Sequence, residues 1–568
     1  MKKNVMLVSL VLGLSACSNL GNKPTTTDVT VLGLNDFHGN LEPTGFAGKK
    51  IPDPKDSTKT INLPTGGAAI IGGYVDSVRA KNANTLFVGA GDLIGASPVT
   101  SSLLRDEPTI IAMTKMGMKV SSLGNHEFDQ GLKELLRMQN GGCDSNDTTK
   151  ACKFQNPYPK SGFRYLGANV VYHDTLKPVF DPYEIETTKS GAKVAFIGAV
   201  LKGTPDIVSP EGIKGLDFLD EAASINKYIP ELKAKKVDAI FVLIHQGGTS
   251  PDGYAASACT TLTGPIVDIA NAIDPAVSVI ISGHTHQGYN CKVGDKTVIQ
   301  GDFYGHLLQR VDLKLDLVAH KVLNVTAANV IMDASADTTI PKSQDLSALV
   351  TKAKGLTDTI KLTPIAKIAA PSISKTQNAA GESALGDVIA DSQLYATSDA
   401  SHGSAQIAFM NPGGIRADLL PSAANNTVTF GDTYTVQPFG NTLTVMTLTG
   451  AQIKTVLEQQ WQGQSNGPRI LQVSKGFTYS YDLSKPDGSK VDAASIKLNG
   501  TVVNPTSGYR VVVNNFIAGG GDSFVEFKNG TNVLQQPNLA DVDAFNAYLK
   551  ANEPLATPAQ DRIIKLGQ

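Results

Sequence analysis

Short apolar runs alternate with polar loops and helix-like stretches over residues 28–341. Apolar runs of about four to eight residues, rich in Val and Ile, are typical of strands that are buried on both faces. Helix-like stretches such as "GLKELLRMQN" and "SINKYIPELKAKK" lie between these runs. The alternation predicts an α/β domain whose layers surround a mainly buried sheet. The predicted strands are "DVTVLGL", "NTLFVGAG", "KVAFIGAV", "DAIFVLIH", "VSVIISGH" and "KTVIQGD".

A helix-like stretch at residues 342–362 separates this region from a second one and ends just before Pro364. We expect it to be a connector helix, because Pro cannot continue a helix. Residues 363–568 contain helix-like "ALGDVIADSQLYAT" and "DVDAFNAYLKAN" together with strand-like "AQIAFMN" and "YRVVVNN". A chain of 568 residues is also longer than one hydrophobic core usually supports. We therefore predict two α/β domains, the second smaller than the first.

The N-terminus has the pattern of an export signal. A positive start at residues 1–3 is followed by an apolar run at 5–14, which is too short to span a bilayer. The sequence "LSAC" that follows resembles a bacterial lipobox, which implies a signal peptide at residues 1–17 and lipidation of Cys17. An ordinary signal with an incidental Cys is the alternative. Polar residues 18–27 would form a tether, and we expect an exported lipoprotein, periplasmic or at the cell surface, anchored only by its lipid.

Composition excludes some classes of partner and points to disulfides. Basic and acidic residues nearly balance, 50 against 52, so there is no basic surface for a nucleic acid polymer. Beyond Cys17 four Cys remain, an even number that suggests two disulfides in an oxidising compartment. Cys143 and Cys152 flank one hydrophilic insert, which makes them a natural pair and leaves Cys259 with Cys291. This is the favoured one of three possible pairings.

Polar side chains that can bind metals follow several of the predicted strands. Five of the nine His fall in the motifs "LNDFHGN", "GNHEFD", "LIHQGG" and "SGHTH", and a further carboxylate lies in "GAGDLIGASP". Ligands bind at the carboxyl ends of strands in open α/β sheets. A mixed set of imidazole, carboxylate and amide ligands suits two divalent ions such as Zn, Mn, Co or Fe. The candidate ligands are Asp36, His38, Asp92, Asn125, His245, His284 and His286.

The order of these motifs resembles the calcineurin-like metallophosphoesterases, and in particular the bacterial 5′-nucleotidase/UDP-sugar hydrolase family. The resemblance covers almost the whole chain after the signal. It implies a four-layer α/β/β/α metallophosphoesterase domain over residues 28–341 and a substrate-binding domain over 363–568. The ligand sets that it implies are Asp36, His38 and His286 for one ion, Asn125, His245 and His284 for the other, and Asp92 bridging both.

The same resemblance assigns His126 as the catalytic imidazole, oriented by Asp129. A carboxylate partner fixes the tautomer of an imidazole and favours its protonated form, which agrees with this role. Glu127 receives no role. The implied reaction is the attack of a metal-bridging hydroxide on phosphorus, with His126 and the two ions offsetting the charge on the phosphoryl oxygens.

In the second domain the motifs "NPGGIRADL", "QPFGNTL" and "NNFIAGGGDSF" resemble the nucleotide-binding segments of that family. Arg416 would bind phosphate, and Phe439 and Phe516 would hold the base between their rings. Asn441 and Asp522 would form hydrogen bonds with the nucleoside. Outside the family context, each Phe would more simply be a core residue.

One position departs from the family. Relatives commonly carry an Arg shortly before the segment that matches Leu385-Gly386, whereas this chain has no Arg between Arg310 and Arg416. Lys375 or Asn378 could take its place, although an ammonium binds phosphate less specifically than a guanidinium. The departure implies weaker phosphate binding or a different preferred leaving group.

These observations predict an exported, monomeric phosphohydrolase that removes phosphate from 5′-nucleotides. Within the same fold, the alternatives are hydrolysis of NAD or a UDP-sugar, of a 2′,3′-cyclic nucleotide, or of a sulfur ester. The Phe pair argues against the sulfur ester. An alternative of another class is a surface nucleotide-binding protein that has no catalytic activity.

Overall fold

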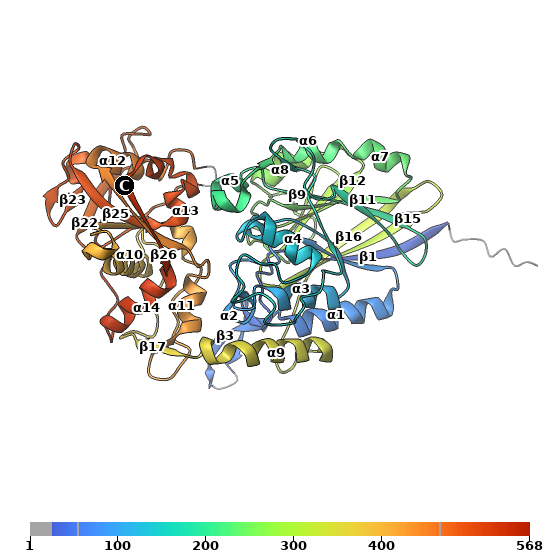
Figure 1. Ribbon diagram of the computed structural model, residues 1–568. Coiled ribbons are helices and arrows are strands. Elements are labelled where there is room, and N and C mark those ends of the chain that lie inside the picture. Colours follow the sequence, from blue (N-terminus) through green and yellow to red (C-terminus); the bar gives the residue numbers. More distant parts are fainter. Residues whose placement is uncertain (1–24, 54–55, 465–466, 568) are drawn as a thin grey trace, which may run out of the picture.

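The computed structural model describes residues 25–53, 56–464 and 467–567. The signal peptide, Cys17 and most of the predicted tether lie outside these residues. Two α/β domains lie side by side, joined at one end by the long helix α9 (Gln344–Lys361) (Figure 1). The predicted two-domain α/β fold is confirmed. The first strand, β1, begins at Thr26, two residues before the predicted start of the domain.

Two six-stranded sheets form the centre of the first domain. In both sheets the central strands run parallel. Antiparallel strands form both edges of the second sheet, whereas the first sheet has antiparallel strands at its β16 edge and the parallel strand β6 at the other. The first sheet has the order β16 (Lys321–Ile331), β15 (Leu307–Asp316), β1 (Thr26–Leu34), β4 (Thr85–Ala90), β5 (Met118–Ser122) and β6 (Arg164–Leu166). The second has the order β13 (Gly288–Val293), β14 (Lys296–Gly301), β12 (Val277–Ser282), β11 (Ala239–His245), β9 (Lys193–Val200) and β8 (Tyr183–Thr187).

Burial on both faces explains the continuous apolar runs in these strands. Val31 packs into a core between the two sheets, whereas its neighbour Leu32 packs into the core beneath the covering helices. In the second sheet, Phe241 packs into the core between the sheets, and its neighbour Val242 packs beneath the helices on the other side. The four layers are therefore helix, sheet, sheet and helix. The covering helices are α1 (Ala68–Lys81), α3 (Glu107–Lys115) and α9 on one side and α6 (Glu221–Asn226), α7 (Ile229–Ala234) and α8 (Pro265–Ala272) on the other.

The second domain is built on a five-stranded sheet with an apolar core on each face. Helices α10 (Ala384–Thr397) and α14 (Asp541–Ala551) cover one face, and α12 (Gly450–Glu458) covers the other. The strand order is β21 (Gln472–Val473), β18 (Ile407–Met410), β25 (Gly508–Asn514), β20 (Thr442–Thr449) and β26 (Thr531–Ala540). A smaller sheet consists of β24 (Thr501–Val502), β23 (Lys497–Leu498), β22 (Phe477–Asp482) and β27 (Ile563–Leu566).

Helix α9 is attached to the first domain by charge as well as by packing. Lys354 and Lys361 place their ammonium groups 2.6 and 2.8 Å from the two carboxylate oxygens of Glu42. Burial raises the pKa of Glu42, but the two lysines outweigh it and lower the pKa to about 2. We therefore propose a domain boundary at residues 362–363, directly after the helix.

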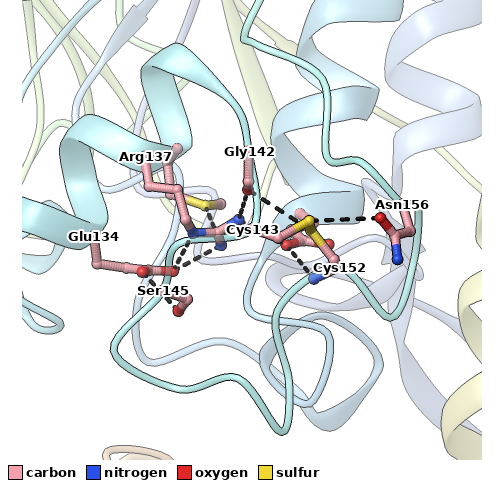
Figure 2. The surroundings of a disulfide bond; sticks show 9 residues. Glu134, Arg137, Gly142, Cys143, Ser145, Cys152 and Asn156 are labelled. Carbon is pink, nitrogen blue, oxygen red and sulfur yellow. Dashed lines mark hydrogen bonds and ion pairs between the residues drawn. A yellow bond between two sulfur atoms is a disulfide. The ribbon is translucent and has the colours of Figure 1, made fainter.

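Both predicted disulfides are present. Cys143 is bonded to Cys152 and Cys259 to Cys291. The first bond closes a surface loop beside Arg137 and Glu134 (Figure 2). Of the helices in residues 25–53, 56–464 and 467–567, none is both long enough and apolar enough to cross a bilayer.

Candidate functional site

The candidate metal ligands lie at the carboxyl ends of parallel strands from both sheets. Asp36 and His38 follow β1, Asp92 follows β4, and Asn125 follows β5. The remaining ligands come from the second sheet, in which His245 ends β11 and His284 and His286 follow β12. The packed sheets thus bring residues that are up to 250 positions apart in the sequence, Asp36 to His286, to one edge.

Five of these seven residues have a left-handed backbone. The φ angles are positive at Asp36 (48°), His38 (46°), Asp92 (50°), His284 (75°) and His286 (54°). Non-glycine residues seldom adopt this region, and each instance costs about 1–3 kcal/mol. The turns after β1 and β4 hold one another in place, because the amides of Asp36 and His38 donate to the carbonyls of Gly91 and Asp92.

Asp36, His38 and His286 form a first group whose ligand atoms converge. His286 Nε2 lies 3.3 Å from Asp36 Oδ1 and 3.1 Å from His38 Nε2. The other ring nitrogen of His38, Nδ1, lies 2.8 Å from the carbonyl of Gly95 and so carries the proton. The Nε2 lone pair of His38 therefore faces the space shared with Asp36 and His286, an arrangement that fits a cation.

Asp92 and His245 form a second convergent group with Asp36, next to His284 and Asn125. His245 Nδ1 lies 2.9 Å from the carbonyl of Ala90, which leaves Nε2 as the free ligand atom, 2.9 Å from Asp92 Oδ2. That Nε2 is buried and, apart from this contact with Asp92, has no hydrogen-bond partner within the described part of the chain. His284 Nδ1 lies 3.1 Å from Asn125 Oδ1.

Asp92 lies between the two groups, since its Oδ2 is also 3.7 Å from His38 Nε2. The imidazole, carboxylate and amide donors at this edge suit divalent metal ions.

Burial and charge set the protonation of this edge. Burial lowers the pKa of both His38 and His284 to about 3, which keeps the two rings neutral and able to bind a metal. Burial also lowers the pKa of His245, but Asp92 and Asp36 outweigh it and raise the pKa to about 10. Burial raises the pKa of Asp36, whereas His245 and His286 bring it down to about 2.

Glu127, to which the sequence assigns no role, joins two of the ligand loops. Its carboxylate accepts hydrogen bonds from the amides of Asp92 (2.8 Å), Leu93 (2.9 Å) and Gly124 (2.6 Å). It is buried, and burial together with Asp92 raises its pKa to about 7. Nothing in the local sequence marks it, because an acidic residue in a turn is ordinary.

His126 and Asp129 lie at the two ends of one 3₁₀ turn, η1 (His126–Phe128), which directs both side chains the same way. His126 Nδ1 is 2.8 Å from Asp129 Oδ2, and the His126 amide donates to Asp92 Oδ1 at 2.9 Å. Burial lowers the pKa of His126, but Asp129 and Asp92 outweigh it, so the net pKa is raised. The ring of Phe439, from the second domain, stacks on His126 at 5.6 Å.

A cavity of about 210 Å³ opens between the two domains at this point. We call it the interdomain cavity. His126, Asp129, Asn125 and His284 line its first-domain side, together with residues 207–209, which the sequence does not single out. All five residues predicted to bind substrate line the other side, namely Arg416, Phe439, Asn441, Phe516 and Asp522, as do Asn411, Gly413 and Gly414.

Asp522 is fixed from two directions. Arg469 Nη1 donates to its Oδ1 at 2.5 Å, and Asn411 Nδ2 donates to its Oδ2 at 2.7 Å. Burial raises the pKa of Asp522, and Arg469 acts against that rise. Neither Arg469 nor Asn411 is among the residues chosen from the sequence, although Asn411 lies in the same "NPGGIRADL" motif as Arg416.

Among the described residues that line this cavity, Arg416 is the single Arg or Lys. Its guanidinium carbon lies 5.6 Å from the centre of the Phe439 ring. Lys375 Nζ donates to the carbonyls of Ile415 and Arg416 and so lies behind the Arg416 backbone. Asn378 instead closes a turn by accepting from the amides of Ala380 and Glu382. Neither Lys375 nor Asn378 lines the interdomain cavity.

Comparison with known proteins gives a match in each domain. Residues 29–288 match the family model described as calcineurin-like phosphoesterase, and residues 364–529 match the one described as 5′-nucleotidase, C-terminal domain.

Two of the relatives that match over most of this chain are more than 30% identical to it. A cell wall protein from Listeria monocytogenes is 34% identical over 552 residues, which cover 92% of this chain and 67% of the relative. The endonuclease YhcR from Bacillus subtilis is 33% identical over 536 residues, which cover 94% of this chain and 40% of the relative. This chain therefore spans less than half the length of the Bacillus protein.

Among solved structures, the 5′-nucleotidase precursor from Thermus thermophilus superposes with a TM-score of 0.74 at 27% identity. The superposition covers 95% of this chain and 100% of that chain.

Proposed function

The chain belongs to the family that joins a calcineurin-like phosphoesterase domain to a 5′-nucleotidase C-terminal domain, and from that premise we propose that it removes phosphate from 5′-nucleotides. The observation that carries the proposal is the interdomain cavity. Candidate metal ligands and His126 line one side of it, and Arg416, two Phe rings and Asp522 line the other. A nucleotide fits this division, because its phosphate needs cations and its base needs flat apolar surfaces.

We assign Asp36, His38 and His286 to one divalent ion, Asn125, His245 and His284 to the other, and Asp92 to both. Such ions supply Lewis-acid chemistry, in that they make water nucleophilic at neutral pH and offset charge on phosphoryl oxygens. The family uses divalent metals, and the convergent Asp and His groups support this assignment.

His126 would act alongside the ions as a hydrogen-bond donor to the phosphate. Asp129 accepts a hydrogen bond from Nδ1, so Nε2 is the ring atom left to face a phosphate in the cavity. The raised pKa of His126 keeps Nε2 protonated over more of the neutral range, so it can donate to an oxygen on which charge develops. Arg416 provides a second donor from the other domain.

The test is phosphate release from AMP by the wild-type protein with added Mn, Co or Zn. We expect activity that is abolished by a chelator and restored by the metal. His126→Ala should lower kcat by about 10²–10⁴-fold, the usual contribution of a general acid or of an oriented donor. Absence of phosphate release with every metal would refute the proposal. Unchanged nucleotide binding in His126→Ala without any hydrolysis in the wild type would instead indicate a binding protein.

A second candidate substrate class is a nucleoside diphosphate ester, such as NAD or a UDP-sugar. Arg416 also lines a neighbouring cavity of about 310 Å³, together with Tyr304, Thr100 and Lys361. A group beyond the first phosphate would have room there. Comparing UMP with UDP-glucose, and AMP with NAD and 2′,3′-cyclic AMP, distinguishes these substrates.

Export is part of the same proposal. The two disulfides favour an oxidising compartment, and one relative is described as a cell wall protein. A lipid anchor and a monomeric state remain expectations from the sequence.

A further inference from the structure

Gln130, the residue directly after Asp129, is held by side chains from two distant segments. Arg105 Nη1 donates to its side-chain Oε1, and Asn146 Nδ2 donates to its backbone carbonyl, both at 2.8 Å. Arg105 also donates to Asn146 Oδ1. The three residues therefore form a closed triangle of hydrogen bonds, which we call the Gln130 clamp.

Arg105 is itself fixed by a buried carboxylate. Its Nε donates to Glu134 Oε1 at 3.0 Å, and its side chain is 9% exposed. Its backbone is left-handed, with a φ of 57°, although it is not a glycine. A buried guanidinium on a strained backbone is costly to hold, and such features persist where the surrounding structure imposes them.

Asn146 is fixed by the loop that the Cys143–Cys152 disulfide closes. Ser145 donates to Glu134 Oε2 at 2.8 Å, and the amide of Cys152 donates to Glu107 at 2.8 Å. Figure 2 shows Glu134 between Arg137 and Ser145, with the disulfide beside Gly142. The loop is thus attached at both ends to the charged network that also holds Arg105.

The clamp lies next to the residue pair that the proposed mechanism uses. Asp129 orients His126 through one hydrogen bond, and it ends a single 3₁₀ turn from which Gln130 projects toward solvent. Arg105, Gln130 and Asn146 line a cavity of about 560 Å³ that also reaches His126 and Asp129. Among the contacts described for Gln130, the side-chain hydrogen bonds from Arg105 and Asn146 are the ones that join this turn to distant segments.

We propose that Arg105 and Asn146 are positioning residues that hold the Asp129–His126 pair through Gln130, with the Cys143–Cys152 loop as their support. The inference rests on the proposed phosphohydrolase function. It assigns a role to the disulfide loop, which lies outside the interdomain cavity.

The first experiment removes the clamp at its exposed members. Asn146→Ala and Gln130→Ala should each lower kcat for AMP hydrolysis by about tenfold to a hundredfold, with KM within about threefold of wild type, because small misplacements of a catalytic group act on the transition state. Gln130→Glu keeps the acceptor for Arg105 and should retain most of the activity. The matched control is Lys133→Ala, which breaks the exposed ion pair between Lys133 and Asp144 of the same loop and should leave kcat unchanged.

The second experiment separates positioning from general damage to the fold. In an Asp129→Ala background, Asn146→Ala should cause no further loss of kcat, because there is no longer an oriented pair to disturb. Additive losses, or a rise in KM without a fall in kcat, would overturn the proposal. If wild type releases no phosphate, the proposed function itself fails; if wild type is active and Asn146→Ala equals it, only the clamp fails.

The third experiment concerns the support. A Cys143→Ser/Cys152→Ser variant should lose kcat as Asn146→Ala does, and combining the two changes should cost little more than either alone. Full activity of the disulfide-free variant would remove the loop from the proposal.

Discussion

His126 is held at both its backbone and its ring. Its amide donates to Asp92, a candidate ligand of both ions, and its ring donates to Asp129. The residue that we propose as catalytic is therefore hydrogen-bonded directly to a candidate metal ligand. A change that shifts Asp92 would move His126 as well, so the effects of substitutions at these two positions should not be additive.

Glu127 is not a candidate ligand, but it holds two of the ligand loops in place. Substituting it tests whether metal binding depends on that hydrogen bonding. Glu127→Ala leaves three buried amides, those of Asp92, Leu93 and Gly124, without an acceptor. We expect a loss of about 1–3 kcal/mol in the free energy of unfolding and a roughly 10- to 100-fold weaker affinity for Mn²⁺ or Zn²⁺. Thermal unfolding and metal titration calorimetry measure the two effects.

Glu127→Gln retains one acceptor oxygen and should fall between wild type and Glu127→Ala. Glu553→Gln, at an exposed position, is the matched control and should change neither quantity. Wild-type metal affinity in Glu127→Ala would show that the ligand loops hold their own positions.

At this scale the sequence singles out the candidate ligands, which the structure brings together, but not the residues that hold them in place. His245 and His284 follow apolar runs, so the linear pattern marks them. Glu127, Arg105 and Asn146 make their contacts with partners that no local spacing identifies. Arg105 contacts Asn146 across 41 positions, and that pairing exists only once the loop folds back.

Among the elements, the strands follow their apolar runs closely because both faces are buried. The stretch "SINKYIPELKAKK" differs, since one helix-like pattern becomes two helices, α6 and α7. Pro230 lies at the start of α7, where its missing amide costs nothing, whereas inside one continuous helix it would break the hydrogen bonding. The periodicity therefore predicts that this stretch is helical, and Pro230 determines where the second helix begins.

Helix α10 carries a carboxyl group that should make stability depend on pH. Burial raises the pKa of Asp387 to about 9, although the Arg562 guanidinium 3.8 Å away acts against the rise. The unfolded value is about 3.9, so the folded state binds more protons between these two values. The stability of the fold should therefore fall as pH rises through this window.

Asp387→Asn removes that dependence. We expect the variant to be more stable than wild type by at least about 1 kcal/mol at pH 8, with the difference shrinking toward pH 5. Urea unfolding at the two pH values measures this. A difference that is equal at both pH values would contradict the raised pKa.

For the whole molecule, the attachment of α9 to the first domain leads us to propose residues 362–363 as the place where the domains turn relative to each other. At the opposite end of the domain contact from α9, helix α5 (Thr204–Ile207) lies next to the second domain (Figure 1), and residues 207–209 line the interdomain cavity. A Cβ placed on Gly519 would lie 3.3 Å from ring atoms of Pro210. The sequence predicts the connector helix, but which domain it belongs to depends on Glu42, some 300 positions away.

A cysteine pair at these two positions tests whether turnover needs the domains to move. We expect Pro210→Cys/Gly519→Cys, once oxidised, to lose at least about tenfold in kcat for AMP and to recover on mild reduction, since closure and product release set many turnover rates. Each single variant, and wild type under the same reductant, serves as a control. Equal rates in the oxidised and reduced forms would show that no rotation is required.

The left-handed backbone at five candidate ligands has a consequence for engineering. At each of these positions glycine would relieve the turn and also delete a ligand. A screen that selects variants for heat resistance alone would therefore favour the loss of candidate metal ligands. We expect such a screen to yield proteins that are thermostable but inactive. Any library built to raise the thermal stability of this chain should therefore leave five positions unchanged, namely Asp36, His38, Asp92, His284 and His286.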